Sequence, residues 1–337
     1  MIIHEGSFVL ILEESLETHL IFGALGQDGS YLAEKLSAEG KRVIGIVRDS
    51  AVVPEVSKEK KIKYIKGNIL DSEFVQEILL SCQPSHVYNF AALSSVAKSH
   101  TYPELSEKIN LGFVKDLIDN IQSTQKENKQ EVYLLQASSS EMFGPNHSKP
   151  IAEDATHDPR SPYALHKSLA HRYCLESRKS KNLKIGTAIL FNHESPRRPL
   201  NFVSRKITHG AFQIARGFEK KLILGNITIS RDWGFAPDYV QAMYQLGQHR
   251  VDDDFVVSSG ELHSLEEMCE IAFAYLGMSD YGNYVKSDKM LFRENENSGL
   301  IGDSSKIFSR LDWSPSTSFK NMIEIMVNAE SNNAYLN

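Results

Sequence analysis

The chain carries the stretch LIFGALGQDG at residues 20–29, a short apolar run followed by three glycines spaced G-x-x-G-x-x-G. The apolar run predicts a buried strand, and the residues that follow predict a helix beginning at the turn. Glycines let a backbone approach a pyrophosphate, and a helix N-terminus offers free N–H groups and a positive dipole end. The stretch therefore predicts the first strand–turn–helix unit of a dinucleotide-binding fold.

Further short apolar runs follow along the chain, with helical stretches such as residues 73–80 and 112–121 between them. Strands without alternation of apolar and polar residues, separated by helices, are typical of a parallel, doubly wound sheet. The predicted fold class is α/β, a Rossmann-type sheet with a smaller C-terminal substrate-binding lobe. The predicted strands are residues 20–22, 43–47, 64–65, 86–90, 132–135 and 185–191.

Three parts make up the predicted domain organisation. Residues 1–17 precede the first interpretable unit and have no assigned role, although residues 8–12 are a candidate edge strand. Residues 18–195, with later returning segments, form the cofactor-binding Rossmann domain. Residues 196–337 form most of the substrate lobe, because segments there become shorter and loops more frequent.

The composition is that of an ordinary globular protein, with 337 residues, 41% apolar and 24% charged. A net charge of −6 argues against a general nucleic-acid binder. The three cysteines lie far apart in the sequence, so neither a metal site nor a disulfide framework is predicted. The early apolar run at residues 8–12 is too short to cross a membrane, and a cytoplasmic protein is expected.

Tyr163 and Lys167 stand four residues apart in the run SPYALHK at residues 161–167. On a helix this spacing places both side chains on one face. A nearby ammonium favours the phenolate, so the tyrosine can exchange protons with a sugar hydroxyl at neutral pH. The pair predicts a catalytic acid/base.

Ser139 and Glu141 lie just past the predicted strand at residues 132–135, at the edge where open α/β sheets place their ligands. The hydroxyl can hydrogen-bond a sugar oxygen, and the carboxylate can act as acid or base. We therefore group Ser139, Glu141, Tyr163 and Lys167 as the candidate catalytic residues.

Arg48 follows the second predicted strand, where an arginine accommodates the 2′-phosphate of NADP and an acidic residue would bind the ribose of NAD. Since Arg48 precedes Asp49, NADP is the expected cofactor and NAD the less favoured one. The other candidate cofactor-binding residues in this half of the chain are Gly23, Leu25, Gly26, Gln27, Asp28, Gly29, Asn68, Ile69, Ala91, Ala92, Ser94, Tyr163 and Lys167.

Taken together, these segments resemble the extended short-chain dehydrogenase/reductase superfamily, and within it the GDP-mannose 4,6-dehydratases. The likeness runs from about Leu20 to the C-terminus. The matching strings are residues 26–34, 136–141, 161–167, 190–198, 202–208, 224–226 and 231–234.

The resemblance implies a reaction with no net redox change, which yields a 4-keto-6-deoxy nucleotide sugar. Tyr163, tuned by Lys167 and assisted by Ser139, takes the proton of the hexose C4 hydroxyl while NADP⁺ accepts the C4 hydride. Glu141 then removes the C5 proton and helps water leave from C6, and the hydride returns to C6.

The resemblance also implies further ligand contacts. His193 and Arg198 would face the cofactor. The implied substrate-binding residues are Ser94, Asn192, Lys206, Arg231, Arg293 and Glu296.

Several positions depart from the family pattern. Leu93 and Ser95 replace a glutamine and a histidine near the sugar, so another GDP-sugar, such as an N-acetylhexosamine or a heptose, is an alternative substrate. The loop after the second strand is cut to a few residues around 50–54, which favours a homodimer through the Tyr163 helix over a tetramer. The remaining departures are Phe22, Asn68, Pro199 and Glu294.

Two other functions remain open from the sequence. A nucleotide-sugar epimerase or reductase would share Tyr163 and Lys167, but it has no need of a carboxylate at Glu141. A silent cofactor-binding scaffold would normally lack the tyrosine or the lysine. The sequence therefore favours a GDP-sugar 4,6-dehydratase, with GDP-mannose as the leading substrate.

Overall fold

The structure is a computed structural model that describes residues 17–53, 62–145, 147–292 and 299–333. The candidate strand at residues 8–12 lies outside these ranges. The chain divides into two compact units. The first comprises the described parts of Met1–Ser138, Ser161–Thr187 and Leu246–Asp253, and the second those of Ser139–Arg160, Ala188–Gln245 and Asp254–Asn337. In the described ranges, no helix combines the length and apolarity needed to cross a bilayer.

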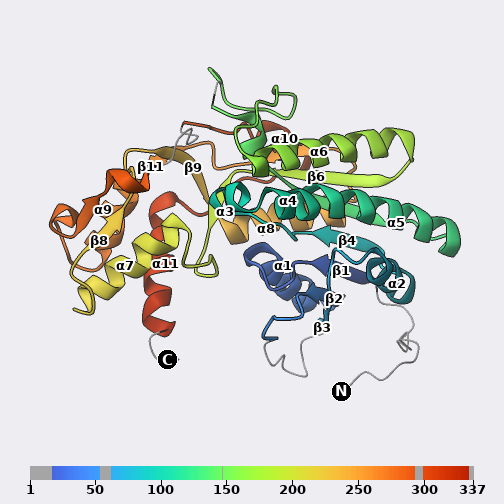
Figure 1. The fold of residues 1–337 in the computed structure, drawn as a ribbon, viewed down its shortest axis with the longest axis horizontal. Coiled ribbons are helices and arrows are strands. Elements are labelled where there is room, and N and C mark those ends of the chain that lie inside the picture. The colour runs from blue at the N-terminus through green and yellow to red at the C-terminus, as the bar shows by residue number, and fades with distance from the viewer. Residues whose placement is uncertain (1–16, 54–61, 146, 293–298, 334–337) are drawn as a thin grey trace. The chain divides into compact units, whose positions relative to one another are not determined.

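The elements alternate between strand and helix along most of the first half of the chain (Figure 1). In order they are β1 (Thr18–Phe22), α1 (Gln27–Ala38), β2 (Arg42–Val47), β3 (Ile62–Lys66), α2 (Ser72–Cys82), β4 (His86–Asn89), α3 (Val96–Thr101), α4 (Pro103–Glu107), the π-helix η1 (Lys108–Gly112), α5 (Phe113–Asn128), β5 (Tyr133–Ser139), the 3₁₀ turn η2 (Ser140–Phe143), α6 (Pro162–Ser180) and β6 (Lys184–Leu190).

The second half of the chain has shorter elements. They are β7 (Asn192–Glu194), α7 (Val203–Ala215), β8 (Leu222–Leu224), β9 (Ser230–Phe235), α8 (Ala236–Gln248), β10 (Asp254–Val257), β11 (Leu262–Ser264), α9 (Leu265–Tyr275), η3 (Tyr281–Asn283), β12 (Val285–Ser287), η4 (Lys289–Leu291), α10 (Ser305–Leu311) and α11 (Phe319–Asn333).

The described strands form a seven-stranded sheet in the order β10-β6-β5-β4-β1-β2-β3, a three-stranded sheet β11-β9-β7 and a pair β12-β8. The pairs β1–β2, β1–β4, β2–β3 and β4–β5 are all parallel. The order reverses between β1 and β4, which is the topological switch point where such sheets bind nucleotides. The predicted α/β Rossmann-type fold is confirmed.

The core of the first unit explains why the apolar runs become strands. Leu20 and Phe22 of β1 are fully buried in a cluster with residues of α2 and α5, while Ile21 between them points to the other face. Helices α2, α5 and α6 pack side by side (Figure 1). Because both faces of the sheet are covered, the strands read as continuous apolar runs.

The second unit has its own core, formed by α7, α9 and α11. Ile207, Phe273 and Met326 are fully buried in it. The unit therefore buries an apolar centre of its own. Three residues that the sequence assigns to substrate binding, Asn192, Lys206 and Arg231, lie on its elements β7, α7 and β9.

Each predicted strand is observed, with its ends shifted by at most four residues. The predicted helix at residues 112–121 differs more. It runs on to Asn128, and a π-helix precedes it at Lys108–Gly112. Apolar spacing does not reveal this wider turn, which places the buried Asn110 inside the first unit.

Candidate active site

Two glycines of the turn, Gly23 and Gly29, have no room for a side chain. A Cβ on Gly23 would lie 2.9 Å from the backbone of Ala91, and Gly23 itself has a φ of +80°. A Cβ on Gly29 would lie 2.3 Å from the Gly23 carbonyl oxygen. Helix α1 begins at this turn, and its N-cap, Gly26, has no side chain to bond the first N–H groups. The turn thus fits a dinucleotide pyrophosphate, as the sequence predicts.

The ends of β4 and β5 are joined by buried amides. Asn89 Nδ2 donates to Gln136 Oε1 at 2.8 Å, and Asn89 Oδ1 accepts from the Ala91 N–H at 3.1 Å. Gln136 Nε2 donates to the Ala137 carbonyl at 2.8 Å. Asn89 therefore fixes the small-residue segment that includes Ala91 and Ala92, which passes close to Gly23.

The start of α6 explains where Tyr163 and Lys167 lie. Ser161 caps the helix by accepting from the Ala164 N–H at 3.1 Å, and Pro162 occupies the first helical position. The Tyr163 N–H is held by Ser99 Oγ at 3.1 Å. Both candidate side chains are buried, and Lys167 Nζ lies 5.9 Å from the centre of the Tyr163 ring.

Lys167 is buried, and its ammonium is bonded to a backbone carbonyl. Its Nζ donates to Ala137 O at 2.9 Å, at the end of β5. Desolvation by burial lowers the pKa of Lys167 from its ordinary 10.5 to about 8. The ammonium therefore remains mostly protonated at pH 7 and can favour the phenolate of the nearby tyrosine.

A polar network joins the π-helix to α6 within the first unit. Asn110 Oδ1 accepts from the Leu93 N–H at 3.1 Å, and its Nδ2 donates to the Leu93 carbonyl and to Ser106 Oγ. Ser106 Oγ lies 3.0 Å from His166 Nδ1, on the helix turn between Tyr163 and Lys167. Asn110 thus fixes the backbone of Leu93, which is one of the positions that depart from the family pattern.

The remaining cofactor candidates of this unit lie at strand ends. Arg48 is exposed after β2. Asn68 accepts the Leu70 N–H at 3.0 Å in the turn that carries Ile69. Ser94 is exposed, and the neighbouring Ser95 caps α3 by accepting the Lys98 N–H. Each position borders the carboxyl edge of the parallel strands.

Ser139 and Glu141 lie in the second unit, around the turn η2. Ser139 Oγ accepts from the Glu141 N–H at 3.3 Å, so the serine fixes the backbone of the carboxylate-bearing residue. Gly144 ends the turn with a φ of +70°, and a Cβ there would lie 2.0 Å from the Asp158 carbonyl oxygen. The loop that follows η2 is therefore closely packed against this turn.

The second unit carries the cofactor candidate His193 and most of the substrate candidates. His193 is buried on β7, with Nδ1 2.7 Å from Phe191 O and its ring stacked 4.8 Å from that of Tyr239. Asn192 and Arg231 are partly exposed on β7 and β9, and Lys206 is exposed on α7. Arg293 and Glu296 lie outside the described residues.

Asp232, beside Arg231, was not anticipated from the sequence. Its buried carboxylate accepts from Ser259 N and Oγ, from Gly260 N and from Gly302 N, at 2.6 to 3.1 Å. These hydrogen bonds connect β9 to two loops that are distant in sequence, and they fix the strand that carries Arg231. In the sequence, Asp232 is only an acidic residue between an arginine and a tryptophan, and nothing there indicates its role.

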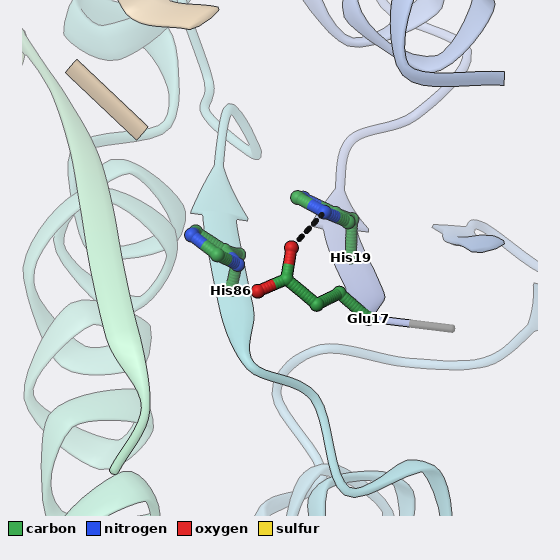
Figure 2. A group of neighbouring side chains, drawn as sticks. All are labelled: Glu17, His19 and His86. Atoms are coloured by element: carbon green, nitrogen blue, oxygen red, sulfur yellow. Dashed lines mark ion pairs between the residues drawn. The ribbon is translucent and has the colours of Figure 1, made fainter. Parts of the chain in front are cut away.

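A separate group of titratable residues lies at the other end of the sheet, where β1 and β4 begin. Glu17, His19 and His86 have ligand-type atoms within 4.8 Å of one another (Figure 2). The rings of His19 and His86 are stacked, with centroids 4.5 Å apart and planes 9° apart. An ion is bound in the plane of each imidazole at about 2 Å. Parallel stacked rings cannot direct two lone pairs to one such point.

The same group is better described as a buried, neutral histidine pair. Burial lowers the pKa of His19 to about 3, and burial lowers that of His86 to about 4. Lys41 Nζ donates to Glu17 Oε2 at 2.9 Å, so that carboxylate already has a cationic partner. We assign no metal to this group.

The fold and the Tyr–Lys helix define a short-chain dehydrogenase/reductase. Similar solved structures include a UDP-glucose 4-epimerase from Thermotoga maritima (TM-score 0.81, 20% identity, 94% of this chain and 99% of that chain). Another is RMD from Pseudomonas aeruginosa complexed with NADPH (TM-score 0.77, 20% identity, 94% and 99%). At such identities the likeness concerns the fold.

The sequence comparisons are more specific. The family described as GDP-mannose 4,6 dehydratase matches residues 20–326. GDP-mannose 4,6 dehydratase 1 of Arabidopsis thaliana is 38% identical, over 92% of this chain and 89% of that protein. GDP-mannose 4,6 dehydratase of Homo sapiens is 34% identical, over 92% and 90%. The chain belongs to the GDP-mannose 4,6-dehydratase family, which confirms the resemblance seen in the sequence.

The glycine turn gives a first test. Gly29→Ala should destabilise the protein by about 2 kcal/mol, because the new Cβ meets backbone at 2.3 Å. It should also weaken dinucleotide binding by roughly tenfold or more, since the turn must shift away from the pyrophosphate. Gly112→Ala is the matched control, because its Cβ would have 3.8 Å to the nearest atom. Equal behaviour of the two variants in thermal unfolding and cofactor titration would contradict the assignment.

The histidine pair gives a second test. The folded-state pKa values of His19 and His86 lie below the unfolded value of 6.5. The unfolded chain therefore binds more protons from pH 6.5 down to about 4 for His86 and about 3 for His19. Stability should therefore be full above pH 6.5 and fall below it, by about 2 kcal/mol per histidine at pH 5.

Urea unfolding between pH 7 and 5 measures this loss. The double variant His19→Phe/His86→Phe should show a flatter dependence, because the stacked rings are kept and the titration is removed. His100→Gln, at an exposed ring on α3, should keep the wild-type slope. A double variant with an unchanged slope would contradict the expectation.

Proposed function

We propose that this protein is an NADP-dependent GDP-mannose 4,6-dehydratase, a hydro-lyase that forms a GDP-4-keto-6-deoxy sugar. The observation that carries the proposal is a complete set of Ser139, Glu141, Tyr163 and Lys167 in a chain of this family. Glu141 distinguishes the reaction from epimerisation, because only elimination needs a carboxylate at C5.

Tyr163 acts as the base at the C4 hydroxyl. Its phenol is buried, and the ammonium of Lys167 beside it stabilises the phenolate. Ser139 hydrogen-bonds the same sugar oxygen. NADP⁺ held at the glycine turn would supply the hydride acceptor for C4 and the hydride donor for C6. Lys167 stays fixed through the step because its Nζ is bonded to Ala137 O.

Glu141 moves the second proton. Oxidation at C4 makes the C5 proton acidic, and the Glu141 carboxylate removes it. The carboxyl group formed in this step then protonates the C6 hydroxyl, which leaves as water. When hydride adds to C6, C5 takes up one proton, which balances the one that Tyr163 removed from the C4 hydroxyl. The Glu141 backbone is held by Ser139 Oγ, so the carboxylate starts from a defined position.

The exposed Arg48 supports NADP over NAD, because a guanidinium after the second strand can pair with a 2′-phosphate. His193 and Arg198 would face the same cofactor. We assign the diphosphate and nucleoside of the substrate to Asn192, Lys206, Arg231, Arg293 and Glu296, with Ser94 near the sugar. Cationic groups are the expected partners of a diphosphate.

Mass spectrometry on protein incubated with GDP-mannose tests the proposal. Loss of one water with no net cofactor turnover is expected, and GDP-N-acetylglucosamine serves as the comparison sugar. Tyr163→Phe should lower kcat by about 10²–10⁴-fold. Glu141→Gln should still oxidise C4 and so accumulate the absorbance of reduced nicotinamide without water loss.

The control variant is Glu104→Gln on the surface of α4, which should keep wild-type turnover. Water loss from GDP-N-acetylglucosamine alone would move the substrate and retain the chemistry. No water loss from either sugar, with NADP⁺ bound, would contradict the dehydratase assignment.

We infer that the protein is a homodimer that buries the outer faces of α6 and the neighbouring α5. Leu165 and Leu169 lie one turn apart on α6 and are 45% and 38% exposed. Leu105, on α4, which packs against α6, and Tyr102, between α3 and α4, are also exposed. Such a patch is typical of an interface.

Light scattering on the purified protein tests the dimer. Leu165→Glu/Leu169→Glu should give a monomer, because two buried charges would be left without partners. Ile325→Glu, at a 41% exposed position of α11, is the control and should remain dimeric. A monomeric wild type would contradict the inference.

A further inference from the structure

Glu194 is a buried carboxylate that the reaction does not use. It is the last residue of β7, and its side chain is 2% exposed. Ser204 Oγ donates to its Oε2 at 2.5 Å. Arg198 Nε lies 3.1 Å from the same oxygen. One carboxylate oxygen therefore joins the end of a strand, the turn after it and the first turn of α7.

The burial of this carboxylate makes its partners necessary. A carboxylate removed from water is costly unless it is paired and hydrogen-bonded. Here the pairing comes from Arg198, the hydrogen bond from Ser204 and a further stabilisation from the N-terminal end of the 13-residue helix α7. No carboxylate would be placed here for packing alone.

Arg198 is held from two sides. Its Nε forms an ion pair with Glu194, although the geometry of this contact is not that of a hydrogen bond. Its guanidinium carbon lies 3.8 Å from the centre of the Phe202 ring. A guanidinium between a carboxylate and an aromatic ring has few orientations left. The backbone of the turn is fixed as well, because Arg198 N donates to Ser195 O at 3.0 Å.

We propose that Glu194 is the positioning residue that orients Arg198 toward an anionic group of the dinucleotide cofactor. The assignment rests on the proposed function, in which Arg198 meets that cofactor. Glu194 does not touch the ligand and acts only through the guanidinium. Through Ser204 it also fixes the helix that carries Lys206, so the same carboxylate aligns a residue assigned to the substrate diphosphate.

Whether loss of the Glu194 charge weakens or tightens NADP⁺ binding distinguishes a positioning role from a simple effect of charge. Removing a negative charge near a bound anion should tighten binding if charge alone mattered. Loss of orientation should weaken it, because Arg198 becomes mobile and loses its fixed geometry. Glu194→Gln keeps the size of the side chain and an acceptor for Ser204, so it isolates the pairing with Arg198.

The test is NADP⁺ affinity by calorimetry, with GDP affinity measured on the same samples. Glu194→Gln should raise the Kd for NADP⁺ on the order of tenfold, the size of one oriented charge-assisted bond, with GDP changed less than about twofold. In an Arg198→Ala background the Glu194→Gln change should cost nothing further, since its only route to the cofactor is gone.

Glu153→Gln is the matched control. Its carboxylate is also partly buried in the second unit and accepts from the Val256 N–H at 2.8 Å, so wild-type affinity is expected. If Glu194→Gln fails to fold, Glu194→Asp keeps the charge but withdraws it by one methylene, and weaker NADP⁺ binding is again expected.

Three results would overturn the assignment. The first is a folded Glu194 variant with unchanged or tighter NADP⁺ binding, and the second is an additive loss in the double variant. The third is a wild-type protein that binds no NADP⁺, which would overturn the proposed function as well. The first two leave the proposed function intact.

Discussion

The buried ammonium of Lys167 and its bond to the Ala137 carbonyl are the interaction on which the geometry of the first unit depends. Burial of this charge is costly, and the carbonyl at the end of β5 offsets part of that cost. The same carbonyl accepts from Gln136, whose oxygen in turn accepts from Asn89. Asn89 holds Ala91, which lies against Gly23. A chain of contacts thus connects α6 to the glycine turn.

Buried polar groups are costly unless they are paired, and in this chain buried side chains pair several loop and helix groups. At the π-helix, Asn110 satisfies both backbone groups of Leu93. In the second unit, Asp232 and Glu194 satisfy loop and helix donors in the same way. A buried amide or carboxylate with several partners stiffens a loop more than apolar packing can, because each bond has a direction.

The sequence predicted the strands, the glycine turn and the helix that carries Tyr163 and Lys167 well, because each depends on local features. A run such as residues 43–47 has few alternatives to a buried strand. The roles of Asn110, Asp232 and Glu194 were not predicted. Each has a partner far away in the chain, 17 residues for Asn110 with Leu93, 70 for Asp232 with Gly302 and 10 for Glu194 with Ser204, and no local pattern shows these pairs.

By itself the sequence determined the fold class, the family and the identity of the chemical groups, because these are written in glycine spacing, apolar periodicity and the Tyr163–Lys167 interval. Only the tertiary structure decided the environment of those groups. The pKa of Lys167 falls to about 8 because folding buries it. Arg198 has a fixed orientation because Glu194 is buried beside it. Both effects arise from removal of water, which a linear pattern does not record.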